Sequence, residues 1–105
     1  MYKVVGILKR PEGMDFEAFK HWWLTEHAPK VKQWPGLRKY CINLCTSPDQ
    51  AFDGVAEVWF ESEEEMIAAM SSAEGQKLGA ALLEDEGNFI DHSKSSAFLV
   101  REHEL

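Results

Sequence analysis

The stretch Trp22-Trp23-Leu24-Thr25-Glu26-His27-Ala28-Pro29, followed by Trp34-Pro35-Gly36-Leu37-Arg38-Lys39-Tyr40, carries the strongest structural pattern in the chain. Three aromatic residues and one histidine recur there and just upstream at spacings of three, four and four residues, as on one face of a helix. The members of this stripe are Phe16, Phe19, Trp23 and His27. Pro29 is expected to close or kink the helix, and Pro35-Gly36 is expected to form a turn. The stretch therefore predicts the end of an amphipathic helix, a loop and the start of a strand.

Outward from this stretch, the sequence predicts strands and helices in alternation. Strands are expected at residues 2–8, 37–46, 55–60 and 95–100, and a loop at residues 47–50. Asp15 is the expected N-cap of the first helix, and the capping box from Ser62 to Glu65 begins the second. Ser71-Ser72 interrupts the second helix, which continues over residues 74–86 and ends at Gly87.

The resulting order, strand-helix-strand-strand-helix-strand, is the ferredoxin-like pattern of an α+β fold. It predicts a four-stranded antiparallel sheet with both helices, the second of them broken, on one face. The strands are apolar on both alternating faces, so the other face also needs a cover. A chain of 105 residues has no further element for this purpose. The simplest cover is a second copy of the chain, packed sheet against sheet in a homodimeric α+β barrel. Residues 1–105 are expected to form a single domain.

Composition and charge exclude several classes of partner. The hydrophobic fraction of 45% suffices for a core, and the net charge of −7 argues against nucleic acid or an anionic membrane surface. Cys41 and Cys45 would lie about 13 Å apart along a strand, too far for a disulfide, so we expect free thiols in a reducing compartment. No segment resembles a signal peptide or reaches membrane-spanning length. The sequence therefore predicts a cytoplasmic protein.

His27 is the main candidate for a catalytic group. It continues the apolar stripe of the first helix, so its side chain should face the sheet or a pocket between helix and sheet. Two interpretations are open: an imidazole held by a backbone carbonyl near a helix end, or a general acid/base for a small carbonyl or phenol substrate. Tyr40, early in the second strand, is either a core aromatic or a hydrogen-bond donor that orients substrate or stabilises an oxyanion.

Glu57 and Trp59 share one face of the third strand and form a second group of candidates. Trp59 is expected either to wall a pocket and stack on a flat substrate, or to pack in the core or a dimer interface. A carboxylate among apolar neighbours needs a partner, which for Glu57 is His27, Arg38 or solvent. Pairing with His27 would raise the basicity of the imidazole.

Further aromatic and charged residues surround these candidates. Three tryptophans lie close together in the chain: Trp22, Trp23 and Trp34. Most of this aromatic surface is expected in the core, and the remainder, with Trp23 as our candidate, would wall an apolar pocket for a hydrophobic or aromatic ligand. Asp85, Asp91 and His92 form a weaker set near the expected pocket mouth. Charged loop residues are usually solvated, so exposure is the default expectation, with Asp85 kept as a candidate substrate contact.

The sequence offers no recognisable metal or haem site. His21 and His27 are six residues apart and do not share a helix face. A haem would need an axial histidine on the second helix, and residues 63–86 contain none. We therefore expect no metal, no haem and no other cofactor.

Three motifs together resemble the EthD family, which belongs to the dimeric α+β barrel group. They are His27-Ala28-Pro29, Pro35-Gly36-Leu37 with Tyr40, and the run from Asp53 to Ser62. The resemblance extends from Tyr2 to about Glu102 and implies the same fold and dimer. Relatives in the barrel group include lactone isomerases, polyketide cyclases, decarboxylases, and haem and quinol oxygenases. The muconolactone methylisomerases carry a cysteine where this chain has Val58, so the resemblance does not carry thiol chemistry to that position.

The residues and the resemblance together suggest three functions. The first is a cofactor-independent isomerase, cyclase, dehydratase or decarboxylase acting on a small lactone, aromatic or polyketide-like molecule. His27 would be its acid/base and Tyr40 its hydrogen-bond donor. The residues expected to contact the substrate are Trp23, Glu57, Trp59 and Asp85. The second is a non-catalytic accessory or ligand-binding protein of a xenobiotic (ether) degradation pathway, as the family name suggests, and the third is a cofactor-independent oxygenase.

Overall fold

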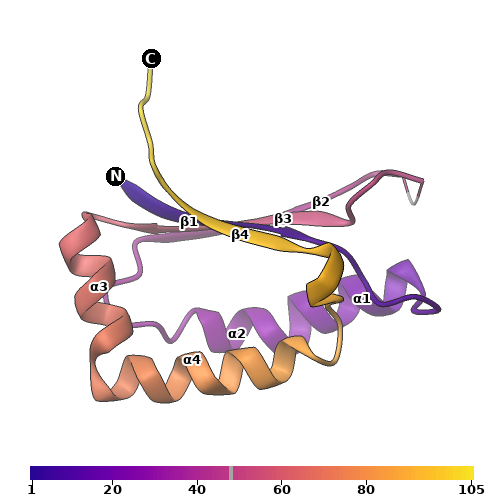
Figure 1. Ribbon diagram of the computed structural model, residues 1–105, viewed down its shortest axis with the longest axis horizontal. Coiled ribbons are helices and arrows are strands. Elements are labelled where there is room, and N and C mark those ends of the chain that lie inside the picture. The colour runs from indigo at the N-terminus through magenta and orange to yellow at the C-terminus, as the bar shows by residue number, and fades with distance from the viewer. Residues whose placement is uncertain (48) are drawn as a thin grey trace.

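The predicted order of strands and helices is confirmed in a computed structural model, which describes residues 1–47 and 49–105 (Figure 1). The elements are β1 (Tyr2–Leu8), α1 (Phe16–Trp22), η1 (Trp23–His27), α2 (Ala28–Val31), β2 (Lys39–Leu44), β3 (Gly54–Phe60), α3 (Glu63–Ser71), α4 (Ala73–Glu86), η2 (His92–Lys94) and β4 (Ser96–Arg101). The strands form one antiparallel sheet in the order β2-β3-β1-β4. This is the ferredoxin-like α+β fold. Pro48, in the loop expected at residues 47–50, lies outside the described residues.

The helices described here all lie on one side of the sheet, and the other side is open (Figure 1). The strand register separates the residues of the two sides. Val4 lies opposite Val58, and Gly6 opposite Ala56, on the side that meets the helices. Because successive side chains of a strand point to opposite faces, Val5 and its partner Glu57 belong to the open side. The alternation predicted for β2 and β3 is therefore confirmed, and the register shows which set of alternate residues in each strand faces the helices.

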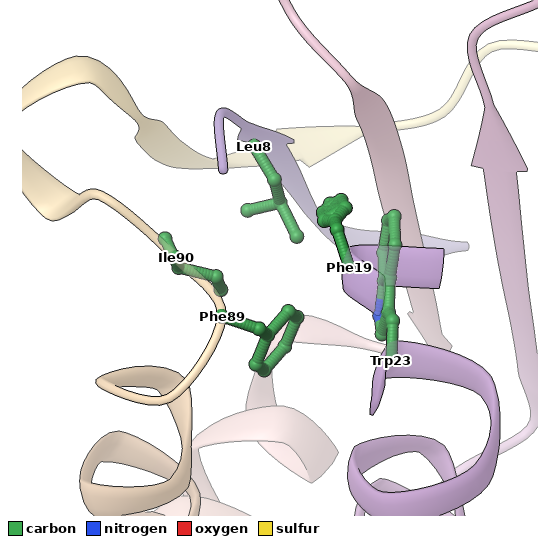
Figure 2. Close-up of a cluster of buried hydrophobic side chains, with 5 residues drawn as sticks. All are labelled: Leu8, Phe19, Trp23, Phe89 and Ile90. Atoms are coloured by element: carbon green, nitrogen blue, oxygen red, sulfur yellow. The ribbon is translucent and has the colours of Figure 1, made fainter. Parts of the chain in front are cut away.

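The core lies between the helices and the covered side of the sheet. Figure 2 shows one buried cluster, in which side chains from β1, from the first helix and from the segment after α4 point toward one another. Its members are Leu8, Phe19, Trp23, Phe89 and Ile90. The ring centroids of Phe19 and Trp23 lie 5.4 Å apart, and those of Phe19 and Phe89 lie 5.8 Å apart, within the range of favourable aromatic pairs. The stripe predicted for the first helix is therefore its buried face.

Pro29 was expected either to close or to kink the first helix, and the structure shows that the helix does not end there. It passes from α1 through a π-helical turn, η1, into α2, and Pro29 lies in the first turn of α2. The backbone N–H of Ala28 bonds to the carbonyl of Trp23, five residues back. Proline has no N–H to donate and its ring crowds the carbonyl four residues earlier, and the wider π turn relieves both problems. The helix therefore continues, and His27 is the last residue of the π turn.

The second helical segment follows its predicted caps. The hydroxyl of Ser62 accepts a hydrogen bond from the backbone N–H of Glu65 at 3.1 Å, which begins α3. Ser72 ends α3 and caps α4 by accepting from the backbone N–H of Gly75 at 3.0 Å. The predicted break at Ser71-Ser72 is therefore confirmed as the junction of two helices. It lets α4 run back alongside the first helix, where it brings its own residues to the covered side.

Candidate functional site

A cavity of about 300 Å³ lies between the helices and the covered side of the sheet. This volume is at the lower end of the range for small-molecule sites, roughly 300–1,000 Å³. Its walls are mostly apolar, with Val4, Ala56 and Val58 from the sheet and Trp23 and Trp34 from the first helical region. The polar side chains among the lining residues are His27, Tyr40, Glu86, His92, Ser95 and Ser96. An apolar cavity with a few converging polar groups is the usual form of a site for a small organic molecule.

His27 and Asp85 form a buried pair at this cavity. Nδ1 of His27 lies 2.7 Å from Oδ2 of Asp85, and the two residues are 5% and 6% exposed. The π turn holds His27 on the buried face of the first helix, and Asp85 lies on α4. The ring of Phe89 packs against the imidazole with centroids 4.9 Å apart. The imidazole is therefore held by a carboxylate and an aromatic ring that come from the other end of the chain.

The proton arrangement of this pair follows from the state of Asp85. Burial acts to raise the pKa of Asp85, but the hydrogen bonds from His27 and Lys30 and the Lys30 charge outweigh burial and hold that pKa below its usual value. Nζ of Lys30 lies 3.2 Å from Oδ1 of Asp85, and Nε1 of Trp22 donates to the same oxygen at 3.3 Å. An ionised carboxylate only accepts hydrogen bonds, so Nδ1 of His27 is the donor.

The second ring nitrogen of His27 is available to a ligand. Nε2 makes no hydrogen bond to any of the residues described, and it is not among the polar atoms sealed from solvent. With the proton on Nδ1, a neutral imidazole presents the lone pair of Nε2. Since His27 lines the cavity, the pair can accept a proton there, and Asp85 then stabilises the imidazolium. A carboxylate that orients a histidine in this way is a recurrent arrangement in acid/base catalysis.

Tyr40 and Trp23 form the second polar feature of the cavity. Nε1 of Trp23 donates to the hydroxyl oxygen of Tyr40 at 3.2 Å. An indole N–H is a donor only, so the hydroxyl proton of Tyr40 is left for another acceptor. Burial raises the pKa of Tyr40 to about 12, and the nearby Glu86 charge adds to the rise although the bond from Trp23 opposes it. At neutral pH the hydroxyl is therefore protonated and can serve as a hydrogen-bond donor.

The position of Trp23 depends on a glycine in the sheet. A Cβ atom on Gly54 would lie 2.5 Å from Cζ3 of Trp23 and 2.8 Å from the backbone oxygen of Asn43. The indole therefore packs directly on the backbone of β3, a contact that only glycine permits. Asp53, the preceding residue, is fully buried, and its carboxylate pairs with the guanidinium of Arg10. The Asp53-Gly54 dipeptide thus fixes both the strand end and the tryptophan that holds Tyr40.

Glu57 and Trp59, two of the expected substrate contacts, do not line this cavity. Alternate residues of β3, namely Ala56, Val58 and Phe60, face the helices. Glu57 and Trp59 lie between them in the strand and therefore point to the open side of the sheet. Glu57 bonds to Nζ of Lys3 at 3.0 Å and to Nδ2 of Asn43 at 3.0 Å, so the pairing with His27 or Arg38 does not form. The hydrogen bond from Lys3 is the main cause of a lowered Glu57 pKa.

The surroundings of Trp59 fit a sheet surface better than a ligand wall. Lys3 and Lys39 place their ammonium groups 4.8 and 4.7 Å from its ring centroid. Its indole Nε1 donates to the carboxylate of Glu102 at 3.2 Å. Cation–π contacts and this hydrogen bond bury the ring to 7% exposure without a ligand. This agrees with the alternative in which Trp59 packs at a core or interface position.

Asp85, Asp91 and His92 were expected to be exposed, but Asp85 is buried. His92 is exposed at the cavity mouth, where its Nε2 lies 2.9 Å from Oε1 of Glu86. Asp91 caps the short η2 helix by accepting from the backbone N–H of Ser93. Glu86 was not predicted as a site residue. Glu86 directly follows Asp85 at the end of α4. The sequence signal that could have indicated it is this position next to Asp85, a carboxylate on the apolar stripe of the helix.

The described residues contain neither a cluster of metal ligands nor a membrane-spanning helix. Within residues 1–47 and 49–105, no group of three or more His, Cys, Asp or Glu side chains is placed to hold a metal ion. The expectation that the protein uses no metal or cofactor stays a prediction. No helix in the same residues is both long enough and apolar enough to cross a bilayer.

Comparison with known proteins identifies the family. The EthD domain family matches residues 11–93 of this chain. The chain belongs to the EthD family. A curated relative, an uncharacterized 11.0 kDa protein from the thcB-thcC intergenic region of Rhodococcus erythropolis, is 30% identical over an alignment of 106 positions that covers 97% of this chain and 96% of the relative. The predicted family is therefore confirmed.

Solved structures support the fold of this EthD member. An EthD family protein from Bacillus halodurans superposes with a TM-score of 0.77 at 25% identity, covering 98% of this chain and 99% of that one. SnoaB, a cofactor-independent oxygenase from Streptomyces nogalater, superposes with a TM-score of 0.64 at 12% identity, covering 99% and 94%. The second likeness concerns the fold alone. Together with the sheet topology, these matches confirm the ferredoxin-like architecture of the dimeric α+β barrel group.

Proposed function

We propose that this EthD protein is a cofactor-independent enzyme that moves a proton on a small lactone, aromatic or polyketide-like molecule. The observation that carries the proposal is the buried pair of His27 and Asp85, joined at 2.7 Å beside an apolar cavity. Nε2 of His27 would remove a proton from carbon or oxygen of the substrate and return it at another position or to a leaving group. Isomerisation, cyclisation, dehydration and decarboxylation all fit such a step.

Tyr40 would act beside the base. Removal of a proton next to a carbonyl group builds negative charge on the carbonyl oxygen, and a fixed donor stabilises that charge. The hydroxyl proton of Tyr40 is free for this purpose because Trp23 occupies an acceptor position of the same oxygen. Trp23 and Trp34 would form flat walls for the substrate.

The experiment is turnover of a panel of lactones, phenols and polyketide-like compounds by the purified protein. His27→Ala should lower the rate of any converted compound by roughly 100-fold or more, the usual contribution of a general acid/base. His21→Ala is the matched control, since His21 lies exposed on α1 and outside the cavity lining. Equal rates for His27→Ala and the unaltered protein would rule out this mechanism.

An alternative is a non-catalytic accessory or ligand-binding protein of an ether or other xenobiotic degradation pathway. The cavity alone supports it, because an apolar space with two polar anchors binds ligands whether or not it transforms them. In that case hydrophobic ligands would raise the thermal midpoint of unfolding without being converted. A cofactor-independent oxygenase, the activity named for SnoaB, is a third candidate and would consume oxygen in the presence of a quinol.

We also propose that the protein works as a homodimer in the cytoplasm. The open side of the sheet carries apolar side chains, among them Val5, Val55 and the 45% exposed Phe98, and a second sheet would cover them. The thiols of Cys41 and Cys45 are both free, as in a reducing compartment.

The dimer has its own test. Light scattering should give twice the chain mass of 12.0 kDa, and Phe98→Asp should lower the dimer fraction. Leu83→Asp, which changes an exposed apolar residue on the helical side, should leave the mass unchanged. A single-chain mass for the unaltered protein in dilute solution would contradict the dimer.

A further inference from the structure

The cavity contains no group that would bind an anion strongly. No lysine or arginine lines it among the residues described. Lys30, the cation closest to the buried pair, is already bound to Asp85 at 3.2 Å. The ionisable side chains of the lining are His27, Tyr40, Glu86 and His92. A carboxylate, phosphate or sulfonate inside this space would lose its hydration and find no lysine or arginine to pair with, which is unfavourable.

Glu86 adds a negative charge on the path into the cavity. The exposed members of the lining are His92, Ser96 and Ala97, so the mouth lies between η2 and the start of β4. Oε1 of Glu86, at the end of α4, lies 2.9 Å from Nε2 of His92 at this mouth. The side chain of Glu86 is 29% exposed, so this lining residue also meets solvent. Its charge reaches the hydroxyl of Tyr40 and helps to raise the pKa of that group.

The polar groups of Tyr40 and His27 are suited to a neutral ligand. The free proton of Tyr40 is a donor, and Nε2 of His27 accepts a proton in the neutral imidazole. A carbonyl oxygen pairs with the first and an acidic C–H or O–H with the second. The remaining walls are apolar or aromatic and match a flat hydrocarbon framework.

From this arrangement we propose that the cavity admits uncharged, flat carbonyl or phenol compounds and rejects their carboxylate analogues, with Glu86 at the mouth setting the selectivity. The proposal rests on the cavity being the substrate site of the proposed function. It deepens that function by removing acids, including carboxylated lactones and the carboxylate substrates of a decarboxylase, from the expected substrates, and so leaves isomerisation, cyclisation and dehydration.

The test measures binding of two probes of nearly the same shape, the methyl ketone 2-acetylnaphthalene and the anion 2-naphthoate. Titration calorimetry is done at a pH well above about 6.5, the ordinary pKa of a free imidazole. We expect the ketone to bind at least about tenfold more tightly than the carboxylate. Glu86→Gln, which keeps the size of the side chain, should raise the affinity for 2-naphthoate severalfold and change that for the uncharged ketone far less.

A matched control separates the local charge of Glu86 from the net charge of the chain. Glu84→Gln removes the same charge from the exposed surface of α4, outside the cavity lining, and should leave the ratio of the two affinities unchanged. Raising the salt concentration screens surface charges but not the cavity, so the preference for the ketone should persist. Tight binding of 2-naphthoate, no binding of the ketone, or equal effects of Glu86→Gln and Glu84→Gln would each overturn the proposal.

The outcome is independent of catalysis. If His27→Ala leaves turnover unchanged while the ketone preference holds, the acid/base mechanism fails and the selectivity stands. If turnover depends on His27 but the two probes bind equally well, the selectivity fails and the mechanism stands.

Discussion

Oδ2 of Asp85 lies 2.7 Å from Nδ1 of His27, although the two residues are separated by 58 positions in the chain. This contact joins the π turn of the first helix to α4 and fixes the ring nitrogen that faces the cavity. Lys30 and Trp22 hold the other carboxylate oxygen, so the orientation of the imidazole depends on a small network.

The stability that Asp85 contributes should depend on pH in a defined direction. The pKa of Asp85 is lower in the folded protein than its ordinary value, so its contribution is fully present above about pH 4. It is lost as the pH falls through the folded-state pKa. We expect Asp85→Asn to reduce the free energy of unfolding by about 1–3 kcal/mol at pH 7 and by clearly less at pH 3. Urea denaturation at both pH values measures the difference.

Asp15→Asn is the control for this experiment. Asp15 is exposed and its side chain makes no capping hydrogen bond, so its substitution should change stability little at either pH. A penalty for Asp85→Asn that is as large at pH 3 as at pH 7 would show that the carboxylate charge is not the source of the effect.

Tyr40→Phe should affect both stability and ligand binding. It removes the acceptor of the Trp23 indole N–H and leaves that partly buried donor without a partner, at a cost of about 1–3 kcal/mol in the free energy of unfolding. It should also weaken binding of a carbonyl ligand such as 2-acetylnaphthalene. Tyr2→Phe, at a tyrosine whose hydroxyl has no hydrogen bond among the described residues, should be nearly neutral in both measurements. Unchanged affinity in Tyr40→Phe would remove the hydroxyl from the proposed mechanism.

Gly54→Ala tests the contact between the sheet and Trp23. The new Cβ would meet the indole at 2.5 Å and a backbone oxygen at 2.8 Å. Since the backbone oxygen cannot move aside, we expect a loss of about 1–3 kcal/mol or more and a change in tryptophan fluorescence. Gly79→Ala is the control: its Cβ would make an ordinary 3.7 Å contact with Trp34, and alanine favours the helix by about 1 kcal/mol. Thermal unfolding that ranks the two variants in the opposite order would contradict the packing described.

Asp53→Asn should be among the most destabilising conservative changes. The Asp53 carboxylate is fully buried, pairs with Arg10 and accepts the Arg10 backbone N–H at 2.7 Å. Removing one charge of a buried pair typically costs about 3–5 kcal/mol. Chemical denaturation should show a loss in this range, whereas Asp49→Asn, in the exposed loop before it, should show almost none. A loss below about 1 kcal/mol would mean that the pair contributes little net stability.

Local patterns were sufficient for most of the fold. The helical stripe ending at His27, the N-cap at Ser62 and the break at Ser71-Ser72 depend on residues near one another in sequence, and all three were confirmed. The course of the chain at Pro29 was harder to predict, because a proline in the first turn of a helix and a proline that ends one look alike in sequence.

The site was harder to predict because its members come from distant segments. Alternation showed that Glu57 and Trp59 share a face but not whether that face meets the helices. Ala56, Val58 and Phe60, the alternate residues of the same strand, are all apolar. This indicated that they, and not Glu57 and Trp59, face the helices, since a core face rarely carries an unpaired carboxylate. Asp85 could have been placed by a similar argument. It lies three residues after Leu82 on a buried stripe, and a carboxylate there requires a partner.

The π turn adds one residue to the first helix without moving the residues on either side of it off the buried face. Leu24, Thr25 and Glu26 are all exposed, so the turn holds its additional residue on the solvent side while Trp23 and His27 stay buried. Deleting one of the three would remove the bulge and leave the residues on either side nearly in register, because the π turn accommodates one residue more than a regular helix. The aromatic core before the turn and the imidazole after it would stay on the same helix face. We therefore expect family members to differ in length by one residue at this surface turn and still keep the acid/base pair.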